Sequence, residues 1–276
     1  MINKKIMVTG GTGSIGYELV KQLSLENEVI IIDQNKIDIS KIKNVVLEVC
    51  NIKDYSRLDE LFKKHKPDMV FHAAAYKYVT YHEKDFYTEI VDTNINGTVN
   101  LIKCVNKYNV KKFVFISTDK AVNPTSLMGA SKLIGEIIVR RNGGIVVRFG
   151  NVMRSVGSVI PIWEEQIKKG EPITVTDSRM ERYFMSIDEA CYLAITASEM
   201  GKDGETFILD MGKPIKIIDL ANKIIKESGK DVKIKMIKPR EGEKLTEDIM
   251  TESEKEQAIK KDKFWILKWF QLMTLV

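Results

Sequence analysis

The sequence predicts an α/β fold, a Rossmann-type doubly wound parallel sheet with a smaller C-terminal lobe. Three observations predict it. Short β-branched runs alternate with amphipathic helical stretches through the first two-thirds of the 276 residues. Most of these runs are apolar throughout, as expected when helices cover both faces of a parallel sheet. The first run also ends in a glycine-rich turn that opens a helix, an order that is typical of doubly wound folds.

Residues 1–150 are assigned to the main, Rossmann-type domain. Its expected strands are Ile6–Thr9, Val29–Asp33, Val45–Val49, Met69–His72, Phe113–Ser117 and Ile145–Phe149. A helix is expected after the first strand, because apolar residues recur every four positions at Ile15, Leu19 and Leu23. One longer helix should precede the fifth strand, with an apolar face made by Ile90, Ile95, Val99 and Ile102.

Residues 151–276 are assigned to the smaller lobe, although we expect the helix at Ile187–Met200 to return to the main sheet. The other expected elements are helices near Ile160–Lys169 and Leu220–Glu227 and strands at Ile173–Thr176, Phe207–Leu209 and Val232–Ile237. The last stretch, Phe264–Val276, is unusually apolar and predicts a docking helix or an oligomer contact. It is too short, and too interrupted by Lys268, to span a bilayer.

Composition excludes several classes of protein. Apolar residues make up 44% of the chain and charged residues 29%, which argues against disorder, a fibrous chain and a many-pass membrane protein. The net charge of +5 is too small and too scattered to indicate nucleic-acid binding. The N-terminus enters a strand pattern at once, so we expect no signal peptide and a soluble, cytoplasmic protein. No metal site is expected, because the cysteines and histidines are not spaced as metal ligands are. They are Cys50, Cys104, Cys191, His65, His72 and His82.

The glycine turn predicts a dinucleotide site. In its G-x-x-G-x-x-G pattern, Gly10 permits the tight turn, Gly13 lets a diphosphate approach the backbone, and Gly16 lets the helix pack closely on the strand. The diphosphate would meet free N–H groups at the positive end of the helix dipole. We expect the cofactor to be bound by Gly10, Thr12, Gly13, Ser14, Ile15 and Gly16.

Further cofactor contacts are expected where the next strands end. Asp33 ends the second strand, where a carboxylate can accept hydrogen bonds from both adenosine ribose hydroxyls. A carboxylate there repels a 2′-phosphate, so NAD is expected in preference to NADP; the alternative is an acidic residue that merely opens a loop. Adenine contacts are expected from Asn51 and Ile52, and small side chains beside the cofactor from Ala73, Ala74 and Ala75.

The fifth strand ends in a polar run, Ser117-Thr118-Asp119-Lys120, at the edge where open α/β sheets bind ligands. The segment Met128-Gly129-Ala130-Ser131-Lys132 then begins a helix, on which Met128 and Lys132 face the same side. The alternative interpretation makes Asp119 and Lys120 a solvated ion pair, Met128 core filler and Lys132 a surface lysine.

These motifs together resemble the extended short-chain dehydrogenase/reductases, and within them the nucleotide-sugar 4,6-dehydratases of polysaccharide biosynthesis. The resemblance is collinear from residue 6 to about residue 250. The segments that carry it are Gly10–Gly16, His72–Lys77, Thr93–Thr98, Ser117–Pro124, Met128–Lys132, Arg148–Met153, Gly157–Pro161 and Gly242–Leu245. Ser117–Lys132 is the most discriminating of these and points to the branch that acts on UDP-N-acetylglucosamine.

The resemblance implies an internal redox cycle, in which NAD oxidises sugar C4, water is lost across C5 and C6, and the hydride returns to C6. It implies that Asp119 is the acid for the C6 oxygen, Lys120 the base at C5, and Thr118 a hydrogen-bond donor to the C4 oxygen. Lys132 would hold the nicotinamide ribose. Met128 stands where the family usually has tyrosine, and a thioether cannot transfer a proton. A subgroup of these dehydratases carries Met there, which leaves the C4 base open.

The resemblance also implies the substrate contacts. Lys77, Asn151, Arg182, Arg240 and Glu243 are expected to bind a UDP-sugar, with the arginines on the diphosphate and Glu243 on the uridine ribose. Each has an alternative as an ordinary surface residue. The family further suggests a homo-oligomer, through helices around residues 84–108 and 126–141.

Two other functions stay open at this point. One is a UDP-sugar 4-epimerase, which needs an acid and base at C4 but has no use for the Asp119–Lys120 pair. The other is a non-catalytic NAD-binding regulator, for which Met128 is the direct support. Whether C5 is inverted or retained, and the exact sugar, do not follow from the sequence.

Overall fold

The computed structural model describes residues 1–77 and 86–268. Its centre is a nine-stranded sheet in the order β14-β15-β11-β6-β5-β4-β1-β2-β3. From β3 to β11 the neighbouring strands are parallel. The strands are β1 Lys5–Thr9, β2 Glu28–Asp33, β3 Val45–Val49, β4 Met69–His72, β5 Lys112–Thr118, β6 Ile145–Phe149, β11 Thr206–Leu209, β14 Ile259–Lys261 and β15 Phe264–Leu267. This arrangement confirms the predicted α/β fold.

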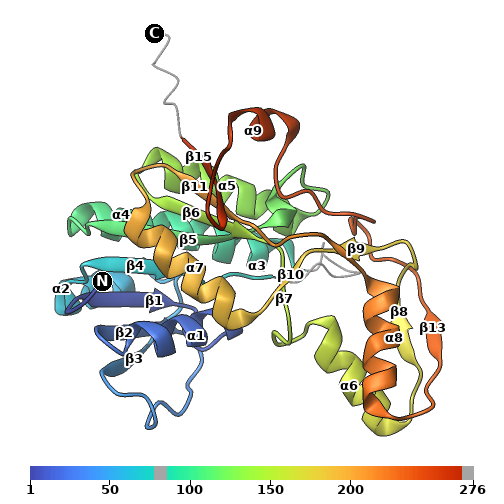
Figure 1. Ribbon diagram of the computed structural model, residues 1–276. Helices are drawn as coiled ribbons and strands as arrows, with labels where there is room; N and C mark the ends of the chain where they lie inside the picture. Colours follow the sequence, from blue (N-terminus) through green and yellow to red (C-terminus); the bar gives the residue numbers. More distant parts are fainter. Residues whose placement is uncertain (78–85, 269–276) are drawn as a thin grey trace.

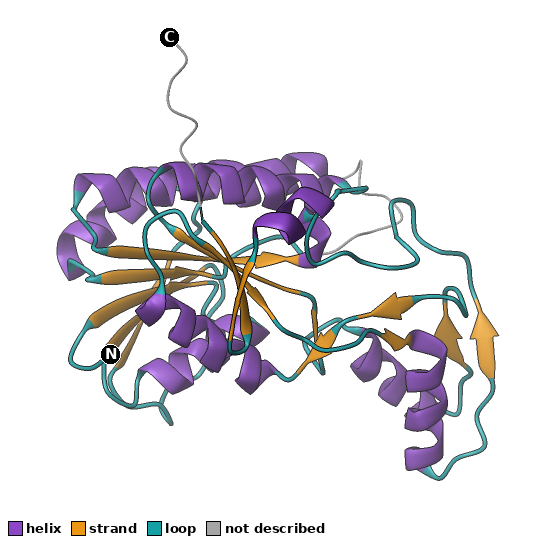
Figure 2. Cartoon of the chain, turned by 45° about the horizontal axis from the view of Figure 1, so that its top comes forward, coloured by secondary structure: helices purple, strands orange, loops and turns teal. Residues whose placement is uncertain are grey.

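Helices cover both faces of the sheet (Figures 1 and 2). One face packs against α1 Ser14–Leu23 and α7 Ile187–Met200, and the other against α2 Tyr55–His65, α4 Gly97–Lys107 and α5 Leu127–Arg141. The run of residues in β2 is almost entirely apolar because alternate residues face the helices on opposite sides of the sheet. Its Val29 and Ile31 pack with α1, whereas Ile30 and Ile32 pack with α2 and α4.

The order of the strands reverses beside β1, which pairs with β2 on one side and β4 on the other. In open parallel sheets, ligands bind beyond the carboxyl ends of the strands at this point. The glycine turn after β1, Asp33 at the end of β2 and the alanines after β4 therefore meet at one edge of the sheet.

The single helix expected around Ile90–Ile102 is interrupted. It consists of α3 Tyr87–Val91, a π-helical segment at Asp92–Asn96, and α4. The π-helix directs Asn94 inward, where its Nδ2 donates to the Tyr76 carbonyl at 2.9 Å and to Ser131 Oγ at 2.8 Å. Asn94 Oδ1 also accepts from the Tyr76 N–H at 2.7 Å. The irregular turn thus ties the segment after β4 to α5, at the edge that holds the site.

The smaller lobe lies beside the main sheet (Figure 1). It is built from α6 Val159–Lys169, β8 Ile173–Val175, α8 Ile217–Ser228 and β13 Ile234–Met236. These elements share their own apolar cluster, in which Trp163 is fully buried. Two short pairs join the lobe to the sheet, β7 Asn151–Val152 with β10 Phe184–Met185, and β9 Glu181–Arg182 with β12 Ile215–Lys216.

The chain from residue 187 onward divides between the two parts of the molecule. As expected, α7 packs on the main sheet, where it contacts α1. β11, β14 and β15 also belong to that sheet, and α9 Glu252–Gln257 precedes β14. A strand, rather than the expected docking helix, occupies Phe264–Leu267, because the free edge of β11 offers backbone partners to this aromatic and aliphatic run. The rest of that apolar stretch, residues 269–276, lies outside the described residues.

Candidate active site

A cavity of about 780 Å³ opens between the carboxyl edge of the main sheet and the smaller lobe. Nearly all of the residues predicted from the sequence line it. They are Gly10, Thr12, Gly13, Ser14, Ile15, Gly16, Asp33, Asn51, Ile52, Ala73, Ala74, Ala75, Lys77, Thr118, Lys120, Met128, Lys132, Asn151, Arg182, Arg240 and Glu243. The exception is Asp119, which is fully buried behind the lining.

The glycine turn has little room for side chains. Gly10 has a φ of +70°, and a Cβ there would lie 2.5 Å from the Ala74 backbone nitrogen. A Cβ on Gly16 would lie 2.0 Å from the Gly10 carbonyl oxygen. Gly13 caps α1 without a side-chain hydrogen bond, so the first N–H groups of the helix receive no acceptor from their cap. Backbone donors at a helix N-terminus in the cavity wall fit a diphosphate.

Asp33 lines the cavity at the end where the sequence predicts the adenosine of the cofactor. Its Oδ2 accepts from the Thr12 N–H at 3.1 Å, and its Oδ1 accepts from the Asn35 N–H at 3.0 Å. The carboxylate therefore ties the glycine turn to the loop after β2 while it lines the cavity. Asn51 lies beside it, with its Nδ2 donating to Gln34 Oε1 at 2.9 Å.

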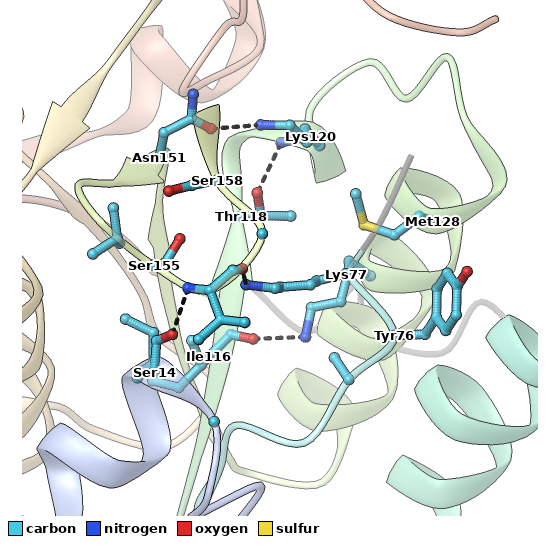
Figure 3. A pocket seen from close by; sticks show the side chains of 18 of the residues that line it. Ser14, Tyr76, Lys77, Ile116, Thr118, Lys120, Met128, Asn151, Ser155 and Ser158 are labelled. Carbon is cyan, nitrogen blue, oxygen red and sulfur yellow. Dashed lines mark hydrogen bonds between the residues drawn. The ribbon is translucent and has the colours of Figure 1, made fainter. Parts of the chain in front are cut away.

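The polar run at the end of β5 forms the opposite wall. Lys120, on the 3₁₀ turn Asp119–Ala121, donates from Nζ to Asp119 Oδ1 at 3.0 Å and to Asn151 Oδ1 at 3.1 Å. The Thr118 hydroxyl donates to the same Asp119 oxygen at 2.9 Å. Figure 3 shows Thr118, Lys120 and Met128 across the cavity from Ser155 and Ser158. The Asp119 side chain does not line the cavity itself. It contacts two residues that do, Thr118 and Lys120.

Helix α5 brings Met128 and Lys132 to this wall. Ser126 caps the helix by accepting from the Gly129 N–H at 3.1 Å. A Cβ at position 129 would lie 2.3 Å from the Lys120 carbonyl oxygen, so Gly129 allows α5 to approach the turn that carries Lys120. Lys132 is buried and donates from Nζ to the Ile116 carbonyl at 2.6 Å. Burial lowers the pKa of Lys132 to about 7, against a smaller opposing effect of Glu136.

Residues 155–158 cross the cavity near the glycine turn. The Val156 N–H donates to Ser14 Oγ at 3.0 Å, and Lys77 Nζ donates to the Val156 carbonyl at 2.7 Å (Figure 3). Burial lowers the pKa of Lys77. The backbone of Val156 thus links a cofactor-side residue to a lysine that was predicted on the substrate side.

Three of the predicted substrate residues, Arg182, Arg240 and Glu243, form a connected group at the lobe. Arg182 is only 5% exposed, and its guanidinium donates to the carbonyl oxygens of Glu181, Lys244 and Leu245 at 2.8–3.0 Å. Glu243 lies 3.5 Å from Arg182 and accepts from the Arg240 N–H at 3.1 Å. In this structure Arg182 holds the 243–245 loop in place, so a diphosphate contact would require its carbonyl partners to be exchanged.

Sequence reasoning did not single out Glu247 or Ser155, which also line the cavity. Ser158, which lies in a segment quoted for the resemblance, lines it as well, and its Oγ is buried without a hydrogen-bond partner. Glu247 is 7% exposed, and its Oε1 lies 3.8 Å from Lys120 Nζ. Its local sequence carries no pattern, because its neighbours in the site come from distant parts of the chain.

Within residues 1–77 and 86–268, no group of three or more His, Cys, Asp or Glu side chains could hold a metal ion. The three cysteines are free and buried. His72 lies between the hydroxyls of Thr9 and Thr98, at 2.8 and 2.9 Å, and His65 contacts Glu48. His82 lies outside the described residues.

The comparisons with known proteins identify the family. The model described as polysaccharide biosynthesis protein matches residues 6–268. The chain belongs to this family. The resemblance to the extended short-chain dehydrogenase/reductases of polysaccharide biosynthesis is thereby confirmed.

Individual members of the family extend the comparison. CapD of Staphylococcus aureus, a capsular polysaccharide biosynthesis protein, is 40% identical over 280 residues, which cover 92% of this chain and 46% of CapD. A UDP-glucose 4-epimerase of Rickettsia canadensis is 34% identical, over 93% of this chain and 80% of the epimerase. The crystal structure of Pen from Bacillus thuringiensis superimposes with a TM-score of 0.90 and 36% identity, over 96% of this chain and 89% of Pen.

The chain spans about half the length of the first curated relatives that it matches. In the part of the chain that the structure describes, no helix combines the length and apolarity that crossing a bilayer requires.

Proposed function

We propose that this protein is an NAD-dependent nucleotide-sugar 4,6-dehydratase that acts on UDP-N-acetylglucosamine in surface polysaccharide or glycan biosynthesis. The observation that carries the proposal is the group Thr118, Asp119 and Lys120 at the wall opposite the glycine turn. Elimination of water needs both an acid and a base beside the sugar. Met128 cannot supply either, so the proton transfers fall to this group.

The cofactor half of the cavity fits NAD. The uncapped start of α1 suits the diphosphate, and Asp33 lines the cavity where a ribose would lie. When bound, NAD would supply the hydride chemistry, accepting the hydride that leaves C4 and returning it to C6. The negative charge of Asp33 disfavours the 2′-phosphate of NADP. Lys132, with its pKa lowered to about 7 by burial, is proposed to hold the nicotinamide ribose and to favour loss of the C4 hydroxyl proton.

The residues of the opposite wall divide the proton transfers between them. Lys120 takes the C5 proton, because its amine lies at the cavity surface. Asp119 supplies the proton for the departing C6 oxygen. Asp119 is fully buried, and its Oδ1 lies 2.9 Å from Thr118 Oγ1. The transfer is therefore proposed to run through the Thr118 hydroxyl, which turns to give its proton to the C6 oxygen and takes the proton of the Asp119 carboxyl in exchange. Thr118 also hydrogen-bonds the C4 oxygen.

The substrate is proposed to lie between the two halves. Asn151 and Lys77 face the sugar and its diphosphate, while Arg182, Arg240 and Glu243 form the lobe side that holds the uridine diphosphate. Relatives of this chain act in capsular polysaccharide biosynthesis or are described as UDP-glucose 4-epimerases, and both descriptions fit a UDP-sugar site.

A 4-epimerase is the second candidate, and the epimerase of Rickettsia canadensis at 34% identity favours it. An epimerase transfers protons at C4 alone, so it would leave Lys120 without a role. The third candidate, a non-catalytic regulator, is supported by Met128. A homo-oligomer is also proposed, through α3 and α5, on which Tyr87 and Ile134 are exposed.

Incubation of the purified protein with NAD and UDP-N-acetylglucosamine tests the three candidates. We expect mass spectrometry to show a UDP-sugar that has lost one water. An isomer of unchanged mass would support the epimerase and contradict the dehydratase. No turnover of this substrate, with NAD binding retained, would support the regulator.

A further inference from the structure

We propose that Glu247 is a positioning residue for Lys120, which also accepts the proton that Lys120 must lose before it can act as a base. The inference rests on the proposed dehydratase function and deepens it. In the step itself, the Lys120 Nζ–H bond breaks and a Glu247 Oε1–H bond forms. The ammonium and carboxylate become an amine and a carboxylic acid, so the net charge of the site does not change.

Two carboxylates lie beside Lys120, Asp119 and Glu247. Asp119 is the proposed acid and must itself hold a proton, so Glu247 is the one left to accept the proton of Lys120. An ammonium group has three N–H donors, and Lys120 Nζ donates to Asp119 Oδ1 at 3.0 Å and to Asn151 Oδ1 at 3.1 Å. Glu247 Oε1 is a further carboxylate oxygen beside the same nitrogen, at 3.8 Å. Proton transfer requires the pair to close by about 1 Å, to hydrogen-bond length.

Glu247 carries an unsatisfied oxygen at this place. Its side chain is 4% exposed, and its Oε2 is buried 3.8 Å from Lys244 Nζ, with no hydrogen-bond partner among residues 1–77 and 86–268. A buried carboxylate that lacks full hydrogen bonding is costly to the fold, and an apolar side chain would fill the same space without that cost. The position therefore holds a carboxyl group at the expense of stability, which is typical of a functional site.

The segment around Glu247 is fixed at both ends. Lys244 Nζ donates to the Val122 carbonyl at 2.7 Å, and Thr125 Oγ1 donates to the Gly242 carbonyl at 2.7 Å. On the other side of Glu247, Glu254 accepts from buried Arg148 at 2.9 Å. These contacts hold the segment against β6 and the catalytic turn, so Glu247 is presented to Lys120 by a rigid support.

The charges around Glu247 suit a proton acceptor. Burial raises the pKa of its carboxyl, and nearby Asp119 raises it further, while Lys120, Arg182 and Lys244 act in the opposite direction. A carboxyl with a raised pKa takes a proton from a neighbouring ammonium more readily than an exposed glutamate does.

Kinetics of Glu247→Gln, Glu247→Asp and Glu256→Gln test the proposal. Glu256 is exposed on α9 and receives the same chemical change as a matched control. With Glu247→Gln, we expect kcat to fall about 100-fold, with little change in KM for UDP-N-acetylglucosamine or in NAD affinity. The remaining kcat should rise about tenfold per pH unit, because Lys120 must lose its proton to solvent. Glu247→Asp should restore part of the rate. Wild-type kcat and an unchanged pH profile in Glu247→Gln would overturn the proposal.

A measurement without substrate separates this proposal from the proposed function. In protein labelled with ¹³C at the glutamate carboxyl groups, the NMR signal that Glu247→Gln removes identifies Glu247. We expect this signal to titrate at a higher pH than the exposed glutamates, and higher still in Lys120→Met, which removes a neighbouring cation. Titration together with the exposed glutamates would overturn the role of Glu247. Absence of dehydration by the wild type would instead overturn the dehydratase.

Discussion

The two halves of the cavity are built differently. The cofactor half, made by residues 10–16, Asp33, Asn51–Ile52 and 73–75, offers mainly backbone groups and small side chains at consecutive strand ends. The substrate half, made by Thr118–Lys120, Asn151, Arg182 and residues 240–247, contains charged side chains that already contact one another. The first half is ready to receive a ligand, whereas charged groups of the second must exchange partners when a ligand binds.

This difference predicts where electrostatic sensitivity lies. Backbone N–H groups at the start of α1 keep the same dipole at every pH, so the diphosphate contact of the cofactor half should vary little. In the substrate half, Lys120 Nζ lies 3.0 Å from Asp119 and 3.8 Å from Glu247, so a change in one of these charges alters the electrostatic surroundings of the others. Substitutions in the two halves should therefore affect different measurements.

Lys120→Ala should give the largest effect, a loss of kcat of about 10²- to 10⁴-fold, because it removes the proposed base at C5. NAD affinity should stay within about twofold of the wild type, since Lys120 lies on the opposite wall from the glycine turn. Product mass spectrometry and a fluorescence titration with NAD measure the two quantities. Lys213→Ala, at an exposed position, is the matched control. Dehydration at the wild-type rate by Lys120→Ala would show that Lys120 is not the base at C5. It would also contradict the expectation that substitutions in the substrate half affect catalysis.

The cofactor half could be predicted because its signals are local. The turn Gly10–Gly16 lies within one strand-to-helix connection, and the strands Val45–Val49, Met69–His72 and Ile145–Phe149 end where the pattern of apolar residues ends. The burial of Met69–His72 and Ile145–Phe149 on both faces leaves a largely apolar signal that does not depend on distant contacts.

The substrate half depends on contacts that no local pattern encodes. The sequence predicts that Arg182 binds an anion, but two of its three carbonyl partners, on Lys244 and Leu245, lie 62 and 63 residues away in a loop of no regular structure. Glu247 meets Lys120 only because Lys244 reaches Val122, 122 residues away in the chain. The strand at Phe264–Leu267 likewise depends on the free edge of β11, and a short apolar run cannot by itself distinguish a strand from a helix.

Asp33→Asn should give a smaller effect, confined to the cofactor half. Loss of the charge should lower the affinity for NAD by about 10- to 100-fold, the cost of losing hydrogen bonds to a charged group. The affinity for NADP should fall much less. At saturating NAD, kcat should stay close to the wild-type value. Asp38→Asn, an exposed residue in the same loop, is the control, and calorimetric titration with each dinucleotide measures the affinities. An equal loss for NAD and NADP would show that Asp33 acts on the glycine turn through Thr12 rather than on the ribose.

Lys132→Met should give the smallest effect, a change in how the stability of the protein depends on pH. Lys132 sharpens the comparison of the two halves because it is proposed to contact both the cofactor and the C4 hydroxyl of the sugar. Its pKa is lowered by burial from 10.5 to about 7. Below pH 7 the folded and unfolded states are both charged, and the burial penalty is present in full. Above pH 7 the unfolded state binds more protons, so the stability of the wild type should rise relative to Lys132→Met, by about 1 kcal/mol between pH 7 and pH 8. Urea unfolding of the two proteins without NAD measures the difference, and Lys103→Met, at an exposed position, should show no such trend. Parallel stability curves for the wild type and Lys132→Met would mean that Lys132 stays charged in the folded protein over this pH range and would contradict its lowered pKa.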